Sequence, residues 1–146
     1  MRRLFGASAE ALIIVILVIG LMAVPVFAAK GGGAQASGKP TAGASISLVL
    51  LDSTDGAAHH GQRVSFTVST TATDRPFVRL HCWQGATGVY NNSIGIFPTY
   101  LYDPWLTLDS SYWTAGAEAS CTATVYYYDR RGNQKFMNSL VFAVAP

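Results

Sequence analysis

Two cysteines, three histidines and a few aspartates are the residues of this 146-residue chain best suited to chemistry. Cys82 and Cys121 lack the Cys-x-x-Cys spacing of a redox pair. In an oxidising compartment, a single pair of cysteines most simply forms one structural disulfide. By the chain-entropy model, this bridge would stabilise the fold by roughly 4 kcal/mol. The sequence therefore predicts a structural bridge rather than a reactive thiol.

The histidines and the first aspartates do not have the spacing of a metal site. His59 and His60 are adjacent, so in an extended chain their side chains point to opposite sides, and His81 is distant in the sequence. Asp52 and Asp55 precede a glycine but lack the alternating acidic positions of a calcium loop. Aspartate and glycine are ordinary turn formers, and we interpret this stretch as a turn.

A third group, Asp103 and Asp109 on either side of Trp105, resembles the paired carboxylates of glycosidases. Such a pair needs a cleft and a raised pKa on one member, and neither is a property that a sequence shows. The chain also lacks the hydrolase elbow, the phosphate loop, the zincin helix and the dinucleotide-binding fingerprint. We therefore expect a protein that is not an enzyme and that carries no metal and no cofactor.

Composition limits the possible function classes further. Hydrophobic residues make up 50% of the chain and charged residues 12%, about half the usual share for a soluble domain. This balance excludes intrinsic disorder. The formal net charge is only +2, and no basic stripe is present, which excludes a nucleic-acid partner. The length allows one domain of modest size.

The N-terminus has the three regions of an export signal. Arg2 and Arg3 form the positive region, residues 11–24 form the apolar region, and small residues precede a cleavage site after Ala28. We therefore expect a signal peptide over residues 1–28 and an extracellular or cell-surface location for the mature protein.

Two alternatives to cleavage stay open. Residues 11–29 are just long enough to span a bilayer, so the helix can remain as a membrane anchor. Gly6 followed by an apolar helix with Glu10 resembles a type IV pilin leader, although the glutamate falls one residue short of the usual spacing. Either alternative would make the chain a membrane-anchored or pilin-like surface protein.

Composition changes twice after the leader. Residues 29–44 are rich in Gly, Ala and Ser and predict a flexible linker. From residue 45 to residue 146, apolar and polar residues alternate with a period of two, as Val64, Phe66 and Val68 show. The expected strands lie over residues 46–50, 64–68, 78–83, 105–108, 117–127 and 140–144. We predict an all-β, antiparallel two-sheet sandwich of about seven strands, with both cysteines on the inward-facing positions.

Three stretches, residues 61–68, 80–84 and 116–123, resemble the second, third and sixth strands of immunoglobulin-like domains in uncharacterised secreted bacterial proteins. The resemblance implies an immunoglobulin-like sandwich over residues 45–145. Two features depart from the antibody type. Phe66 takes the place of a cysteine in the second strand, and Ala119 takes the place of the tyrosine two residues before the second cysteine. If Cys82 and Cys121 lie on neighbouring strands, the disulfide lies within one sheet.

Aromatic residues are the best candidates for a binding surface. A long loop is expected over residues 90–105, and a second row of rings shares the outward-facing positions of the third and sixth strands. Such rings suit protein hot spots or sugar stacking, although the loop rings can also pack against the domain. The candidate surface comprises Phe77, Trp83, Tyr126, Tyr128, Tyr100, Tyr102 and Trp105.

Two functions fit these features. The first is an exported, non-catalytic immunoglobulin-like module for protein interaction or extracellular assembly. The second is a carbohydrate-binding module in which polar side chains beside the rings set specificity. Candidate polar partners are Gln84, Asn91, Asn92 and Asp103. The expected partner is thus a protein or a glycan at the cell surface, with membrane contact only if the leader is retained.

Overall fold

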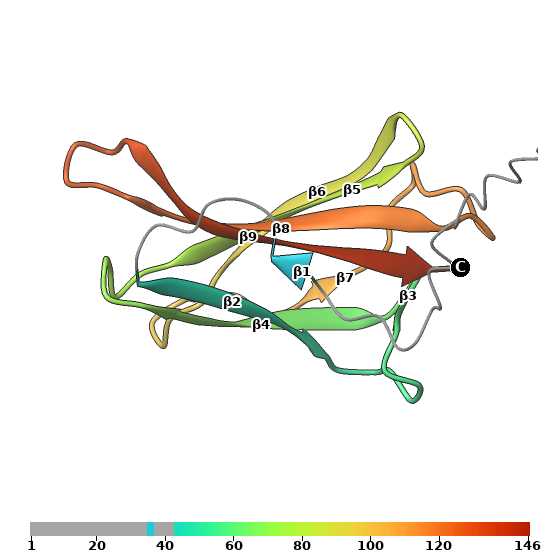
Figure 1. The fold of residues 1–146 in the computed structure, drawn as a ribbon, viewed down its shortest axis with the longest axis horizontal. Helices are drawn as coiled ribbons and strands as arrows, with labels where there is room; N and C mark the ends of the chain where they lie inside the picture. Colours follow the sequence, from blue (N-terminus) through green and yellow to red (C-terminus); the bar gives the residue numbers. More distant parts are fainter. Residues whose placement is uncertain (1–34, 37–42) are drawn as a thin grey trace, which may run out of the picture.

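The computed structural model describes residues 35–36 and 43–146, which form two facing β-sheets (Figure 1). The larger sheet has the order β1-β9-β8-β5-β6, with β3 also paired to β9, and the smaller has the order β2-β4-β7. The elements are β1 (Gln35–Ala36), β2 (Ala44–Leu50), β3 (Ala58–His59), β4 (Arg63–Thr70), β5 (Phe77–Gln84), β6 (Thr87–Gly95), β7 (Leu106–Thr107), β8 (Ala119–Tyr128) and β9 (Gln134–Ala145). The predicted all-β class with two sheets is confirmed.

The signal peptide, the anchor and the pilin-like leader lie outside the described residues. So does most of the linker, although two of its residues form β1, which pairs with β9. In the described part of the chain, no helix is long and apolar enough to cross a membrane.

Alternating side chains explain which face of each strand is buried. In β5, Val78, Leu80 and Cys82 are fully buried, while the residues between them face outward. In β4, Val64 and Phe66 are buried in the same way. The inward faces of the two sheets meet in one core, because each sheet can remove its apolar face from water only against the other.

Cys82 and Cys121 form the expected disulfide. They are direct cross-strand partners of β5 and β8, with 4.0 Å between their Cα atoms, and both are fully buried. The bridge therefore ties two neighbouring strands of the larger sheet together and does not join the two sheets.

The β8–β9 hairpin projects beyond the sandwich on the left of Figure 1. In its loop, Gly132 has a φ of 79°, and the Asp129 carboxylate accepts the backbone N–H groups of Arg131 and Asn133. Hydrogen bonding from Asn133 lowers the pKa of Asp129 below its ordinary value. A positive φ at a glycine costs little, so the sequence fixes this turn locally.

One expectation about the aromatic loop is wrong. Residues 90–95 are not loop but the second half of β6, which pairs with β5 along its whole length. A two-residue turn at Gly85 joins the two strands, and a bulge lies between Cys82 and Trp83. The loop proper therefore starts at Ile96 and crosses from the larger sheet to β7 in the smaller one.

Candidate functional site: an aromatic cluster on the outer sheet face

Six aromatic rings form a connected group where β5 begins and β8 ends. Phe77 stacks on Tyr126, with 5.6 Å between ring centroids, and meets Tyr128 edge to face at 5.8 Å. From the loop, Phe97 and Tyr100 approach Phe77 edge to face at 5.4 and 6.3 Å. Tyr102 continues the chain of rings from Tyr100 at 5.6 Å. We call this group the aromatic cluster: Phe77, Phe97, Tyr100, Tyr102, Tyr126 and Tyr128.

The aromatic cluster has a buried base and an exposed rim. Tyr126 is only 3% exposed, whereas Tyr128 is 51% and Tyr102 76% exposed. Two further exposed apolar side chains count with the rim: Leu101 lies between Tyr100 and Tyr102 in the chain, and Phe136 is the cross-strand partner of Tyr126 on β9. Rings held in place by a buried base present apolar area to a partner at little cost in conformational entropy.

Four of the candidate rings were expected on the outward-facing positions of the third and sixth strands: Phe77, Trp83, Tyr126 and Tyr128. Only three of them lie together in the structure. Phe77, Tyr126 and Tyr128 do, but Trp83 stands six positions further along β5, with its ring 4.0 Å from that of His81. At about 3.3 Å per residue, these six positions separate it from Phe77 by roughly 20 Å. These four rings therefore do not form one continuous exposed patch. Trp83 stands apart, and Tyr126 is covered, with the Arg79 guanidinium 5.2 Å from the centre of its ring.

Glycine at position 95 lets the loop rings reach the sheet. A Cβ atom at Gly95 would lie 2.4 Å from Tyr100 Cδ2 and 2.6 Å from Phe97 Cε1, closer than real Cβ contacts. Ser65 Oγ of β4 then donates a 2.5 Å hydrogen bond to the carbonyl of Pro104, which holds the far end of the loop. The rings are therefore positioned by the strands on which the loop rests.

Trp105 belongs to a different environment. The Arg63 guanidinium lies 5.7 Å from the centre of its ring and also bonds the Asp52 carboxylate, with Nη2 2.6 Å from Oδ1. These bonds to Arg63 lower the pKa of Asp52 from 3.8 to about 2. Trp105 is half-buried and packs in this group, so its ring is not part of the aromatic cluster.

Of the four polar side chains expected to contact a ligand, one is hydrogen-bonded within the protein and three are exposed. The Gln84 amide donates to the carbonyls of Thr114 and Ala117 and accepts the N–H of Thr114, so it holds the 114–117 turn. Asn91 and Asn92 are exposed on β6, and Asp103 is exposed on the loop. Gln84 therefore has a structural role, while the two asparagines remain accessible to a ligand.

His59 and His60 have different partners and do not share a site. His60 lies against Trp113, with 5.1 Å between ring centroids, and its Nε2 is 3.2 Å from Asp109 Oδ1. In the described residues, no group of three or more His, Cys, Asp or Glu side chains is placed to hold a metal ion. The carboxylate of Asp109 is therefore paired with His60. It does not form the carboxylate pair with Asp103 that glycosidases use.

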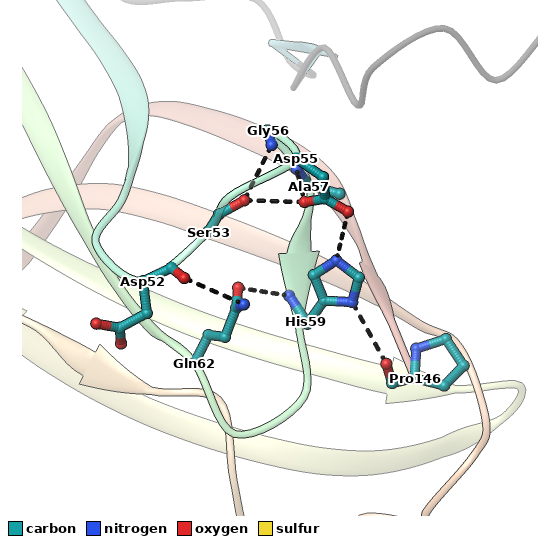
Figure 2. A network of polar contacts seen from close by, with 8 residues as sticks. All are labelled: Asp52, Ser53, Asp55, Gly56, Ala57, His59, Gln62 and Pro146. Carbon is teal, nitrogen blue, oxygen red and sulfur yellow. Dashed lines mark hydrogen bonds and ion pairs between the residues drawn. The ribbon is translucent and has the colours of Figure 1, made fainter.

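His59 connects the 52–56 turn to the C-terminal end of β9 (Figure 2). Its Nε2 lies 2.9 Å from Asp55 Oδ2, and its Nδ1 lies 3.4 Å from the carbonyl oxygen of Pro146. Both ring nitrogens face acceptors, which favours the protonated imidazole. Hydrogen bonding to Asp55 accordingly raises the pKa of His59 above 6.5. Bonds from the N–H of Ala57 and from His59 and Ser53 lower the pKa of Asp55 from 3.8 to about 2.

This contact gives the domain a pH-dependent stability. Because the pKa of His59 is raised on folding, its contribution is complete below pH 6.5 and is lost as the pH rises through the folded value. Because the pKa of Asp55 is lowered, its contribution is complete above 3.8 and is lost as the pH falls toward 2. We therefore expect the ion pair to stabilise most between these limits, by the modest amount of an exposed pair.

His59→Gln tests this expectation. The melting temperature of the wild type should fall more than that of the variant between about pH 6 and about pH 8, a range in which histidine loses its charge. Differential scanning calorimetry at several pH values measures both curves. His60 and His81 are present in both proteins, so the difference isolates His59. Parallel curves would contradict the assignment.

Comparison with protein-family models, with curated proteins and with solved structures finds no match for this chain. The aromatic cluster, its exposed rim and the polar edge of β6 are the features on which a function can be argued. Two residues near that edge, Ser110 and Tyr112, were missed in the sequence because they follow no alternation and lie in the segment between β7 and β8.

Proposed function

We propose that this chain is an exported, non-catalytic immunoglobulin-like module that binds protein, with extracellular assembly as its role, through the aromatic cluster and its rim. The observation that carries the proposal is the exposed rim over a buried aromatic base. Leu101, Tyr102, Tyr128 and Phe136 are 92%, 76%, 51% and 49% exposed. Large side chains exposed together, and fixed in position, are typical of interaction sites.

The strand order supports the immunoglobulin-like part of the proposal. In such domains one sheet contains strands A, B and E, and the other contains G, F and C, with an added C′ in the variable type. The smaller sheet here has the order β2-β4-β7, and the larger contains the order β9-β8-β5-β6. If β2, β4 and β5 are taken as A, B and C, the two sheets have the orders A-B-E and G-F-C-C′, and the described residues contain no strand D.

Two details set this domain apart from antibody domains. The disulfide joins β5 and β8, which correspond to C and F, instead of B and F. Trp83, next to the cysteine of β5, is 40% exposed, and the buried tryptophan is Trp113 in the segment before β8. The proposed likeness is therefore one of topology and not of the antibody core.

Export is supported by the disulfide together with the leader sequence. A buried, cross-strand disulfide persists in oxidising compartments and is rare in the reducing cytosol. Whether the leader is cleaved after Ala28 or kept as an anchor decides how the module is held at the surface.

Sedimentation velocity of the protein recovered after export tests the function. We expect concentration-dependent self-association, because a second copy is the simplest partner in an assembly, and we expect its loss in the triple variant L101S, Y102S and Y128S. Leu51→Ser is the matched control, since Leu51 is 43% exposed at the end of β2 and lies outside the aromatic cluster. A wild type that stays monomeric, or a triple variant that associates equally, would overturn the assembly role.

A further inference from the structure

A shallow groove, lined by polar and aromatic side chains, lies along β6 away from the aromatic cluster. It encloses about 340 Å³ and is lined by His81 of β5, Asn91 and Asn92 of β6, and Ser110 and Tyr112 of the segment before β8. We propose that this groove is a second binding site and that it takes a neutral sugar, with a pyranose ring on Tyr112 and its hydroxyl groups at the asparagine amides.

The free edge of β6 is an obvious site for an added strand, but its backbone is partly occupied. The Ser93 N–H donates to Asn92 Oδ1 at 2.8 Å, and the Val89 carbonyl accepts a hydrogen bond from Ser110 Oγ. Strand addition needs such edge groups to be available. These two side-chain hydrogen bonds occupy the backbone groups on either side of Asn91. They therefore favour a small polar ligand over an extended peptide.

Tyr112 is held out into solvent by a fixed turn. Its ring is 76% exposed, while Trp113, the next residue, is 8% exposed and packs in the core. Ser110 Oγ accepts the N–H of Tyr112 at 3.2 Å, and the Ser110 carbonyl accepts the N–H of Trp113 at 3.1 Å. A rigid, exposed aromatic ring is what the apolar face of a sugar requires, since stacking costs little entropy when the ring is already placed.

The polar groups of the groove suit hydroxyl groups. The Asn91 side chain has no partner among the described residues, so its amide offers both a donor and an acceptor to a ligand. His81 is held in place by its contact with the Trp83 ring. Gly88 allows this contact, because a Cβ there would lie 3.3 Å from His81 Nε2 and from Trp83 Cζ3.

Charge decides the class of sugar. The lining residues include no Asp, Glu, Lys or Arg. A uronic acid or a phosphorylated sugar would need a cation, and an amino sugar would gain from a carboxylate. A neutral hexopyranose needs only amides and one aromatic ring. The groove therefore fits a neutral polysaccharide at the surface on which the protein is displayed.

The test uses the recovered protein and three soluble neutral polymers: laminarin, galactan and dextran. Affinity electrophoresis and isothermal titration calorimetry should show binding to at least one of them. Tyr112→Ala should weaken that binding by about tenfold or more, as expected for the loss of one stacking ring. Asn91→Ala should weaken it as well. Tyr112→Phe keeps the ring and should bind within about threefold of the wild type.

A control variant shows whether a loss of binding is specific to the groove. Leu51→Ala changes another exposed apolar side chain, next to β2 of the smaller sheet, and should bind as the wild type does. Absence of binding to all three polymers, or equal binding by wild type and Tyr112→Ala, would overturn the inference. Neither result bears on self-association through the aromatic cluster, so the two proposals fail separately.

Discussion

Replacing both Cys82 and Cys121 with alanine is expected to lower the free energy of unfolding by roughly 2–5 kcal/mol. The bridge spans 39 positions, and its loss restores conformational freedom to the unfolded chain. Both side chains are fully buried, so the smaller alanines also leave space in the core. Urea unfolding followed by circular dichroism measures the loss.

Reduced wild-type protein separates these two effects. It keeps the sulfur atoms but lacks the cross-link, so it should lose the larger part of the stability and the double variant somewhat more. Intact mass before and after reduction, which differs by two hydrogens for one bridge, shows that the starting material is closed. A double variant as stable as the oxidised wild type would contradict a structural role for the bridge.

Replacing Gly95 with alanine is expected to lower the free energy of unfolding by roughly 1–3 kcal/mol, the usual cost of forcing extra volume into a packed site. The new Cβ would occupy the space of the Tyr100 ring, at 2.4 Å from Cδ2. The loop rings must then move away from Phe77. Urea unfolding gives the energetic cost, and near-ultraviolet circular dichroism reports the loss of the fixed ring arrangement.

A double-mutant cycle with Tyr100→Ala identifies the cause. If the clash is with this ring, Gly95→Ala should cost much less once Tyr100 has been shortened, so the two changes should be strongly non-additive. Additive losses would show that the alanine acts through the backbone of β6 instead. The same variants should weaken self-association, because Tyr102 follows Tyr100 in the chain of rings.

The two-sheet class could be predicted because both sheets bury one face. In β4 and β5 every second residue is apolar, and this alternation marked Val64, Leu80 and Cys82 as inward-facing. β6 escaped prediction because it is an edge strand with accessible polar residues on both faces, such as Asn91 and Asn92. Alternation fades wherever a strand is not half-buried.

The candidate site was predicted only in part, for a different reason. Strand position gives the face to which a side chain points, and Phe77, Tyr126 and Tyr128 do share one face. Strand position does not show which other side chains pack over that face. The burial of Tyr126 therefore could not be predicted from the alternation of residues. Distance along a strand does follow from residue count, so the six positions between Phe77 and Trp83 already place Trp83 outside the group.

The role of Gly95 was also missing from the sequence interpretation. Its φ is not in the left-handed region, and a glycine at a strand end is usually read as a turn former. Only the position of the loop rings shows that close packing requires it. A glycine just before a segment containing Phe97 and Tyr100 was the one available signal.

Hydrogen–deuterium exchange at low and high protein concentration tests the central claim most directly, because it shows which face associates. If the aromatic cluster and its rim form the interface, amides over residues 98–103 and 127–136 should gain protection at high concentration. Those of β2 and β4 in the smaller sheet should not change. Protection that appears on the smaller sheet, or that does not depend on concentration anywhere, would contradict the proposed interaction surface.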